Sequence, residues 1–328
     1  MPKISTETVK LGRKSMSRHV LGGPTMGTRW SAIIHSVTEF DPAPLRLALQ
    51  DAVDTVDLQM STWKPDSDLM RLNSAPTGIW VGIRAPLAAV LSAGLAFGRM
   101  SQGAFDIGMG DAVTAWGFGS RQAEPEAIKA SLAASRRPAH DCIEIDPSGP
   151  RVRKLFSVTL DLSGIAKGYG VDRLAETTCR FGIGSALFSI DGELRALGEQ
   201  PGGEPWAVAV ELPDPNIRAG HSVIALREAS VATSGDYRHF VMLGTKRLSH
   251  TMDPRHGGPV ENPPASVTVV AKCCMAADAM ATALTVMGVE RGAAFAREGG
   301  IDALFLSRVG GGLKATGVGP LFGAPRAA

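Results

Sequence analysis

Apolar and polar residues follow a helical period over much of the first half of the chain. Asp41-Pro42 has the composition of a helix start, an N-cap aspartate followed by proline at the first helical position. Apolar residues then recur at helical spacing, which predicts a helix that continues to about Met60. The same analysis predicts helices over residues 85–100, 124–135 and 165–180, and strands over residues 28–35 and 156–162.

The second half of the chain is richer in short segments of the kind that form strands. Residues 275–287 are the exception, because they are alanine-rich, apolar on most faces and predicted to be helical. Helices and strands therefore follow one another in mixed order, and we expect an α+β fold with mixed or antiparallel sheets. The expected strands cover residues 185–190, 207–211, 221–226, 266–271 and 302–307, the last of which is expected to close the chain.

Composition narrows the classes of function. The chain has 328 residues, of which 44% are hydrophobic, so it is long enough to bury a sizeable core. The 34 basic and 32 acidic side chains nearly balance, which argues against nucleic acid as the main partner. The sequence has no apolar run of 18 residues, so we expect no helix that spans a membrane.

The N-terminal segment and the cysteines bear on location. Residues 1–21 are polar and basic and lack the apolar core of a signal peptide, so we expect a flexible segment and a cytoplasmic protein. The cysteines lack metal-ligand spacing, and the adjacent pair is poorly placed for a disulfide. Four free thiols also favour a reducing compartment. They are Cys142, Cys179, Cys273 and Cys274.

The stretch LDLSGIAKGYGVDRLAE, residues 160–176, joins an apolar run to a predicted helix through glycines and a lysine. It matches neither a P-loop nor a dinucleotide fingerprint. The free N–H groups of such a helix start favour an anion, and Lys167 adds a positive charge. Asp161 would repel phosphate unless it contacts a sugar hydroxyl, a base or a metal. The alternative is a glycine turn with a surface lysine.

Asp278 and Thr282 lie four positions apart in CMAADAMATAL, so a helix places them on one face. Their neighbours are apolar, and a buried carboxylate needs a partner. A hard cation with oxygen ligands would satisfy both side chains. The alternative is an aspartate that favours the helix dipole, with a threonine bonded to its own helix.

Two further side chains are candidates for chemistry or stacking. His250 lies in SHTMDPRHG just before a turn, and a histidine beside phosphate and metal can act as a general base. Trp63 precedes a Lys-Pro-Asp turn, where its ring can stack on a flat base. The alternative for His250 is a histidine that takes no part in catalysis, and the alternative for Trp63 is ordinary packing in the core.

Taken together and in order, eight motifs of the chain resemble the ApbE family, the FAD:protein FMN transferases. The resemblance runs from about Gly22 to Met287 and extends toward the end of the chain. It suggests one catalytic domain over residues 22–328. The motifs are MGTRWS, STWKPDSDLMRLN, GAFD with WGFG, LDLSGIAKGYGVDRLAE, SIDGELRALG, ATSGDYRHF, SHTMDPRHGG and ADAMATALTVMG.

The resemblance implies a compact α+β protein that holds FAD in a cleft between two lobes. Members of this family move FMN from FAD onto a threonine or serine of another flavoprotein, release AMP and usually require Mg²⁺. Their acceptor proteins carry an Asp-x-x-[ST]-Gly-Ala-[ST] segment. This chain has no such segment, so we expect a separate acceptor protein.

The resemblance also implies roles for individual residues. Lys167 and Asp161 would contact FAD, with Lys167 near the diphosphate. The carbonyl of Gly164 and the side chains of Asp278 and Thr282 would hold the metal. His250 would deprotonate the acceptor hydroxyl. Thr233 would shape the flavin end, and the rest of the FAD site would be lined by Met26, Trp63, Ala104, Phe105 and Asp106.

This sequence departs from the usual pattern of the family at several of these positions. Trp63 stands where tyrosine is usual, and Ile107 begins a segment that differs from the usual Pro-Thr-Val type. Asp191 and Glu193 stand where glycine and aspartate are usual. An FAD pyrophosphatase and a non-catalytic FAD-binding maturation protein are the alternative functions. Because most members are exported, the periplasm is the alternative location.

Overall fold

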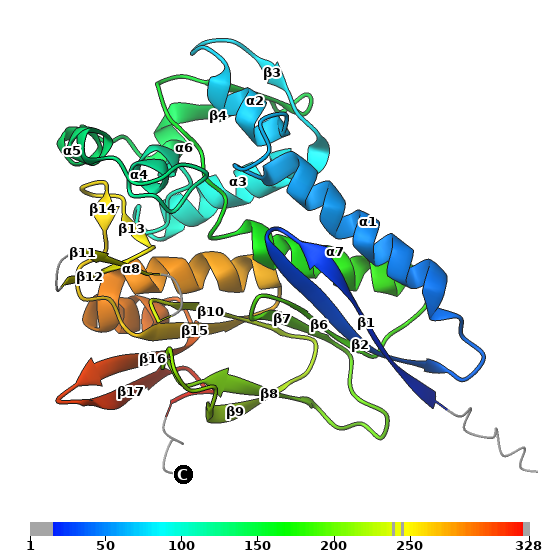
Figure 1. Cartoon of the computed structure of the whole chain (residues 1–328). Coiled ribbons are helices and arrows are strands. Elements are labelled where there is room, and N and C mark those ends of the chain that lie inside the picture. The colour runs from blue at the N-terminus through cyan, green and yellow to red at the C-terminus, as the bar shows by residue number, and fades with distance from the viewer. Residues whose placement is uncertain (1–15, 238–239, 244–245, 324–328) are drawn as a thin grey trace, which may run out of the picture.

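An eight-stranded antiparallel sheet forms the base of the molecule in the computed structural model, which describes residues 16–237, 240–243 and 246–323 (Figure 1). Its strand order is β1-β2-β6-β7-β10-β15-β16-β17. The strands are β1 (Met16–Thr25), β2 (Thr28–Val37), β6 (Ala186–Ile190), β7 (Glu193–Leu197), β10 (Ser230–Gly235), β15 (Ser266–Ala271), β16 (Asp302–Val309) and β17 (Gly312–Val318).

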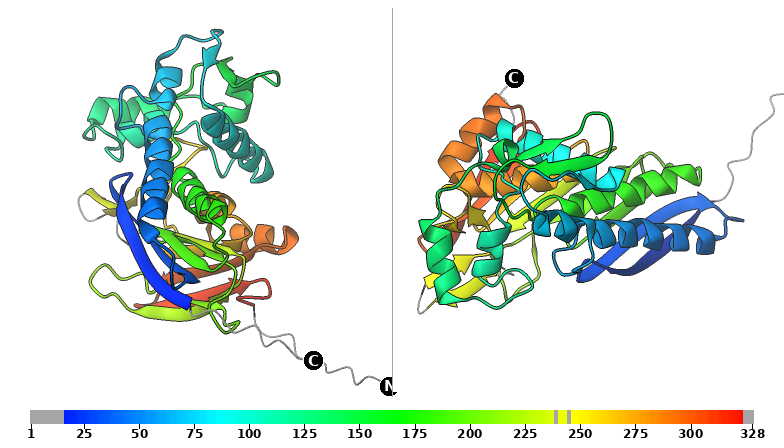
Figure 2. Two further views of the ribbon diagram at one scale, coloured as in Figure 1. Left: turned by 90° about the vertical axis from the view of Figure 1, so that its right-hand side faces the viewer. Right: turned by 90° about the horizontal axis from the view of Figure 1, so that it is seen from above.

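Three long helices cover one face of this sheet (Figures 1 and 2). They are α1 (Pro42–Met60), α7 (Ala166–Arg180) and α8 (Cys274–Glu298). The side chain of Asp41 caps α1 by accepting a hydrogen bond from the backbone N–H of Ala43, so the predicted start is confirmed. Within α8, Gly288 has a φ of 74°, and the helix is kinked there.

A second group of elements lies on the far side of these helices from the sheet (Figure 1). The predicted helix over residues 85–100 is confirmed as α3, and the one over residues 124–135 is confirmed in shorter form as α5. The group comprises α2 (Asp68–Ser74), α3 (Ala85–Met100), α4 (Gly110–Ala115), α5 (Pro125–Ala133), α6 (Ala139–Cys142), β3 (Val81–Gly82), β4 (Ile143–Ile145) and β5 (Arg151–Lys154).

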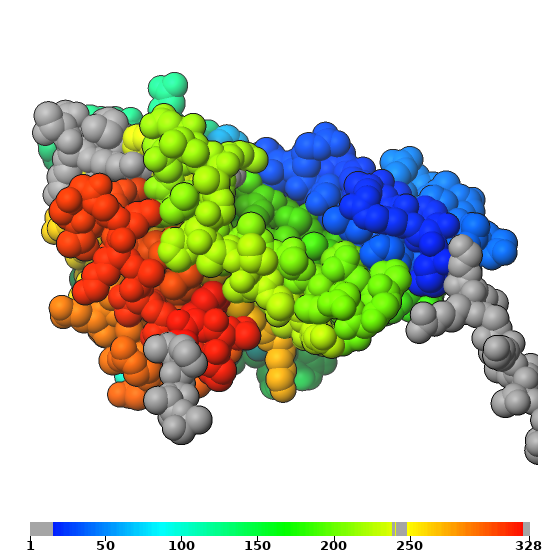
Figure 3. Space-filling view, turned by 90° about the horizontal axis from the view of Figure 1, so that it is seen from below, coloured from blue at the N-terminus to red at the C-terminus, as the bar shows by residue number. Residues whose placement is uncertain are grey.

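A hairpin of β8 (Trp206–Glu211) and β9 (Gly220–Leu226) packs on the other face of the sheet. Its buried apolar side chains contact those of β10 and β16 in a separate core cluster. Figure 3 shows this segment on the underside, beside the red C-terminal strands. Two small ribbons complete the fold: β11 (Phe240–Leu243) pairs with β12 (Lys246–Ser249), and β13 (Met252–Asp253) pairs with β14 (Gly258–Pro259).

The predicted α+β class and antiparallel sheets are confirmed, but three local predictions are wrong. Residues 156–162 form only an isolated parallel bridge, Thr159 with Met109, and no strand, because the side chain of Asn73 bonds both backbone groups of Leu160. The strand over residues 302–307 is confirmed as β16, but it does not close the chain, since β17 follows and pairs with it.

The third concerns the predicted flexible segment, residues 1–21. Residues 16–21 belong to β1, where Met16 pairs with Val37 and an edge strand tolerates polar side chains. Residues 1–15 lie outside the described residues. In the part of the chain that the structure describes, every helix is too short or too polar to cross a membrane.

Candidate active site

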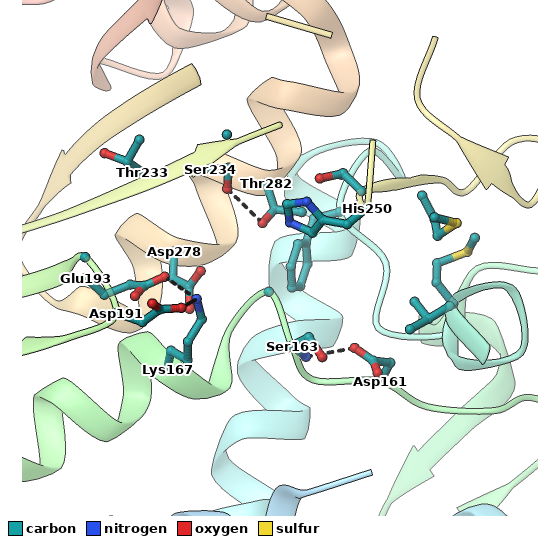
Figure 4. A pocket seen from close by; sticks show the side chains of 18 of the residues that line it. Asp161, Ser163, Lys167, Asp191, Glu193, Thr233, Ser234, His250, Asp278 and Thr282 are labelled. Carbon is teal, nitrogen blue, oxygen red and sulfur yellow. Dashed lines mark hydrogen bonds and ion pairs between the residues drawn. The ribbon is translucent and has the colours of Figure 1, made fainter. Parts of the chain in front are cut away.

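One cavity of about 290 Å³ gathers ten of the twelve residues that the sequence singled out (Figure 4). Its walls come from the segment before α4, the start of α7, the β6–β7 turn, β10, the loop before β13 and one face of α8. The ten are Ala104, Phe105, Asp106, Asp161, Gly164, Lys167, Thr233, His250, Asp278 and Thr282.

The close approach of α7 to α8 brings the predicted diphosphate and metal residues together. A Cβ at Gly168 would lie 2.4 Å from the carbonyl oxygen of Cys274, so only glycine fits at this crossing. The backbone N–H of Gly168 donates a 3.0 Å hydrogen bond to Asp278 Oδ2. Lys167 and Asp278 are therefore held side by side although they are far apart in the sequence.

Asp172 fixes the other end of this crossing. Its carboxylate accepts 2.9 Å hydrogen bonds from the N–H groups of Cys274 and Met275, which are free donors at the start of α8. Arg195 on β7 forms an ion pair with the same carboxylate. One buried aspartate on α7 thus anchors the start of α8 and ties both helices to the sheet.

The ammonium of Lys167 lies between two carboxylates of the β6–β7 hairpin (Figure 4). Its Nζ is 2.9 Å from Glu193 Oε1 and 3.2 Å from Asp191 Oδ2. Burial by itself would lower the pKa of Lys167, but Glu193, Asp278 and Asp191 together raise it. Lys167 is therefore held in its charged form inside the cavity.

The pKa values of the neighbouring acidic side chains are shifted mainly by burial. Burial raises the pKa of Asp278 to about 6, although Lys167 and the N–H of Gly168 act in the opposite direction. Burial also raises the pKa of Glu193 to about 8, again opposed by Lys167. Glu193 Oε2 is buried without a hydrogen-bond partner. This corner of the cavity therefore favours added positive charge.

The residues predicted to hold a metal fit a hard cation. A Cβ at Gly164 would lie 3.0 Å from Thr282 Oγ1, so this backbone segment and the threonine hydroxyl are adjacent. Ser234 Oγ lies 3.3 Å from the same hydroxyl. A carbonyl, a hydroxyl and one carboxylate are the oxygen donors that Mg²⁺ takes. Among the described residues no three His, Cys, Asp or Glu side chains form a metal cluster, in keeping with a set that contains one carboxylate.

The β6–β7 turn explains how Glu193 reaches the cavity. Ile190 pairs with Glu193, which leaves Asp191 and Gly192 as a two-residue loop with φ values of 51° and 103°. Such loops require left-handed residues and favour Asp-Gly. Glu193 then starts β7 with its side chain buried beneath Lys167.

His250 lies on the opposite wall, in the short connection between β12 and β13. Its ring meets that of Phe118 edge to face, with centroids 6.3 Å apart. The next residue, Thr251, is nearly buried and donates its backbone N–H to Ser249 Oγ. The connection thus presents the imidazole to the cavity from a loop rather than from a helix or a long strand.

Asp106 and Asp161 organise their own loops as well as lining the cavity. Asp106 accepts hydrogen bonds from the N–H groups of Gly108 and Ala139, which joins two loops. Asp161 accepts a 2.8 Å hydrogen bond from the N–H of Ser163. Burial raises the pKa of both carboxyl groups despite these bonds.

Met26 and Trp63 do not line this cavity. Met26 occupies the β1–β2 turn with a φ of 44°, and its Cε lies 3.0 Å from where a Cβ at Gly170 would be. It therefore packs on α7 beside the site. Trp63 lies between α1 and α2 and is 66% exposed, so an indole face is open to a ligand or to solvent. Contact of either residue with FAD stays a prediction.

Several lining residues were not assigned a role from the sequence. Glu193 is the most informative, because the Asp-Gly pair before it predicts a hairpin but only the structure shows that its carboxylate is buried. Spacing alone cannot reveal its partner, since Lys167 lies on another element. The others include Ser163, Ser234, Glu211 and Tyr237, the last two joined by a 3.0 Å hydrogen bond.

Comparison with known proteins gives one consistent result. Residues 26–305 match the model of the ApbE family. An FAD:protein FMN transferase of Vibrio cholerae is 34% identical over 90% of this chain and 89% of its own length. The one of Escherichia coli K12 is 33% identical over 92% of this chain and 88% of its own length.

Solved structures agree with the sequence comparisons. The flavin transferase ApbE from Vibrio cholerae superposes with a TM-score of 0.82 at 32% identity, covering 93% of this chain and 98% of that one. The apo form of the flavinyl transferase ApbE of Pseudomonas stutzeri also gives 0.82, at 33% identity, and covers 94% and 98% of the two chains.

Proposed function

This chain belongs to the ApbE family, and from that premise we propose that it is an FAD:protein FMN transferase. In the proposed reaction FMN moves from FAD to a threonine or serine hydroxyl of a separate flavoprotein, and AMP leaves. One observation carries the proposal: a single cavity brings an ammonium, an oxygen-rich corner and an imidazole together.

The proposed reaction exchanges one phosphorus–oxygen bond for another. The acceptor hydroxyl oxygen attacks the phosphorus atom of FAD on the riboflavin side and forms a phosphoester. The bond from that phosphorus to the bridging oxygen breaks, and AMP leaves with the bonding electron pair. The hydroxyl proton passes to His250, which is the only titratable group proposed to act as base.

The residues of the chain divide this work between them. Lys167 supplies fixed positive charge beside the diphosphate, where transfer of a phosphoryl group needs it most. Gly164, Asp278 and Thr282 would hold Mg²⁺, which supplies Lewis-acid stabilisation of the phosphate oxygens when bound. Ala104 and Phe105, both buried, make part of the same cavity wall apolar.

The test uses an acceptor protein that carries an Asp-x-x-Thr-Gly-Ala-Thr segment, incubated with this protein, FAD and Mg²⁺. Intact mass of the acceptor and chromatography of AMP are measured together. A mass gain of one FMN less one water is expected, with an equal amount of AMP. An acceptor in which the last threonine is changed to alanine serves as the control and should stay unlabelled.

The other outcomes identify the alternatives. AMP and free FMN without labelled acceptor would overturn transfer and indicate an FAD pyrophosphatase, in which water replaces the hydroxyl. Tight FAD binding without AMP in the presence of Mg²⁺ would indicate a protein that binds or delivers flavin. Omission of Mg²⁺ should abolish both products, since the oxygen-rich corner would then lack its cation.

A further inference from the structure

Lys167 is held by an inner and an outer carboxylate that differ in exposure. The inner partner, Glu193, has a side chain that is 5% exposed and starts strand β7. The outer partner, Asp191, has a side chain that is 34% exposed and lies in the turn. Both carboxylates line the cavity, but the inner contact is buried and fixed by the fold, whereas the outer contact is partly exposed and can be exchanged for a ligand.

The turn itself does not require a carboxylate at position 191. A residue with a φ of 51° in a two-residue hairpin loop is well accommodated as asparagine, aspartate or glycine. Of these three, only aspartate places a negative charge beside the ammonium of Lys167. The charge of Asp191 therefore needs an explanation other than turn geometry.

The position of Asp191 is the one that an anionic ligand would need. A diphosphate that approaches Lys167 from the cavity meets the exposed side of the ammonium, because Glu193 covers the buried side. There it encounters Asp191 as a competitor for Lys167, with Asp278 nearby as a further carboxylate. Two anions beside one ammonium repel each other unless another cation joins them.

We propose that Asp191 occupies the place of a phosphate oxygen on Lys167 in the free protein and thereby makes FAD binding depend on a divalent cation. This inference rests on the proposed function, because it takes FAD as the ligand. Asp191 acts through Lys167 and is a positioning residue. Its effect is to exclude FAD from the cavity until a cation offsets the surplus of carboxylates.

The test measures FAD affinity rather than turnover. Asp191→Asn keeps the turn and an oxygen that can accept a hydrogen bond from Lys167, but removes the charge. Dissociation constants for FAD are obtained from flavin fluorescence quenching, once with EDTA and once with Mg²⁺. We expect FAD to bind the variant about two- to fivefold more tightly than wild type in EDTA, the size of effect that one partly exposed charge contact has.

With Mg²⁺ present, the FAD affinities of wild type and variant should differ much less. The dissociation constant in EDTA divided by the one in Mg²⁺ should therefore be smaller for the variant than for wild type. If Asp191 only holds Lys167 in place, the variant binds FAD more weakly than wild type in both conditions, which overturns the inference. Unchanged affinity in EDTA overturns it as well. Asp191→Gly should reproduce the result, since glycine also fits the turn.

A matched control separates this effect from a general change in charge. Glu126 also pairs with a lysine, Lys129, but on the exposed surface of α5 away from the cavity, so Glu126→Gln should leave both dissociation constants unchanged. Failure of the proposed function itself gives a different result. In that case wild type binds FAD but leaves the acceptor protein of the transfer assay unlabelled, whereas failure of this inference alone leaves wild-type transfer intact.

Discussion

The cavity wall that carries Lys167 and Asp278 stands on two helices and a tight hairpin, whereas the wall that carries His250 stands on a short loop. On the first wall polar groups are held by direct contacts with one another, such as the bond from Gly168 to Asp278 and the ion pair of Lys167 with Glu193. On the second wall the imidazole is supported by a ring contact with Phe118.

This difference corresponds to the two partners that the proposed reaction joins. Buried charge is costly to leave unpaired, so the wall for diphosphate and cation requires rigid elements that fix each group. In the proposed reaction the hydroxyl would arrive on a second protein, and loops are the usual surface from which a chain meets a partner. The following predictions test this division, in order of expected effect.

Asp278→Ala removes the carboxylate of the proposed metal corner. Several kcal/mol of electrostatic stabilisation depend on that corner, so transfer should fall about 10⁴-fold. The rate of AMP release, measured by chromatography, gives the loss, and isothermal titration with Mg²⁺ should show no binding. Asp51→Ala, an exposed change on α1, is the control. Transfer at the wild-type rate would remove Asp278 from the mechanism.

His250→Ala removes the base but leaves the other wall intact. Transfer should fall about 10³-fold, within the range for loss of a general base. FAD affinity measured by fluorescence quenching should stay close to wild type, which would show that FAD binding depends on the first wall and not on His250. His221→Ala, a change at an exposed position of β9, should have no effect on either quantity. A large loss of FAD affinity in His250→Ala would contradict the division of roles.

Gly168→Ala tests the rigidity of the helical wall. The added Cβ would lie 2.4 Å from a backbone oxygen of α8, so the helices must separate, at a cost of about 2 kcal/mol in the free energy of unfolding. Urea unfolding measures this loss. Gly170→Ala on the same helix meets only side-chain ends at 3.0 Å and should cost much less. Equal losses in both variants would show that the crossing is not tightly packed.

The affinity for Mg²⁺ should depend on pH through Asp278. Its pKa is raised to about 6 without a cation, and the cation requires the ionised carboxylate. Below pH 6 protons compete with the cation, so affinity should fall about tenfold between pH 7 and pH 5. Titration calorimetry in His250→Ala should give the same profile. Affinity that does not change over this range would contradict the assignment.

Sequence patterns predicted the parts of the fold that depend on local rules. The helix over residues 85–100 and the strand over residues 266–271 match α3 and β15, because apolar spacing decides both. The predicted strand over residues 156–162 was wrong for a non-local reason, since the distant side chain of Asn73 forms hydrogen bonds with the backbone of Leu160. β1 was missed because the pairing of an edge strand with β2 is set by its partner.

The same distinction holds at the site. The shared helical face of Asp278 and Thr282 was predictable, because it follows from spacing within one helix. The ion pair between Lys167 and Glu193 was not predictable, because Glu193 comes from a hairpin whose position depends on the whole sheet. Resemblance to a family supplied the expected roles of the site residues, but only the three-dimensional structure shows which charged side chains pair with one another.

The hydrogen bond from Gly168 to Asp278 joins residues 110 positions apart in the chain. A contact of such long range requires the folded chain, so the cavity exists only where α8 is docked against α7. A molecule that occupies the cavity therefore binds folded chains alone and shifts the folding equilibrium toward them. Supply of its own substrate would in this way help to protect the protein from unfolding and proteolysis.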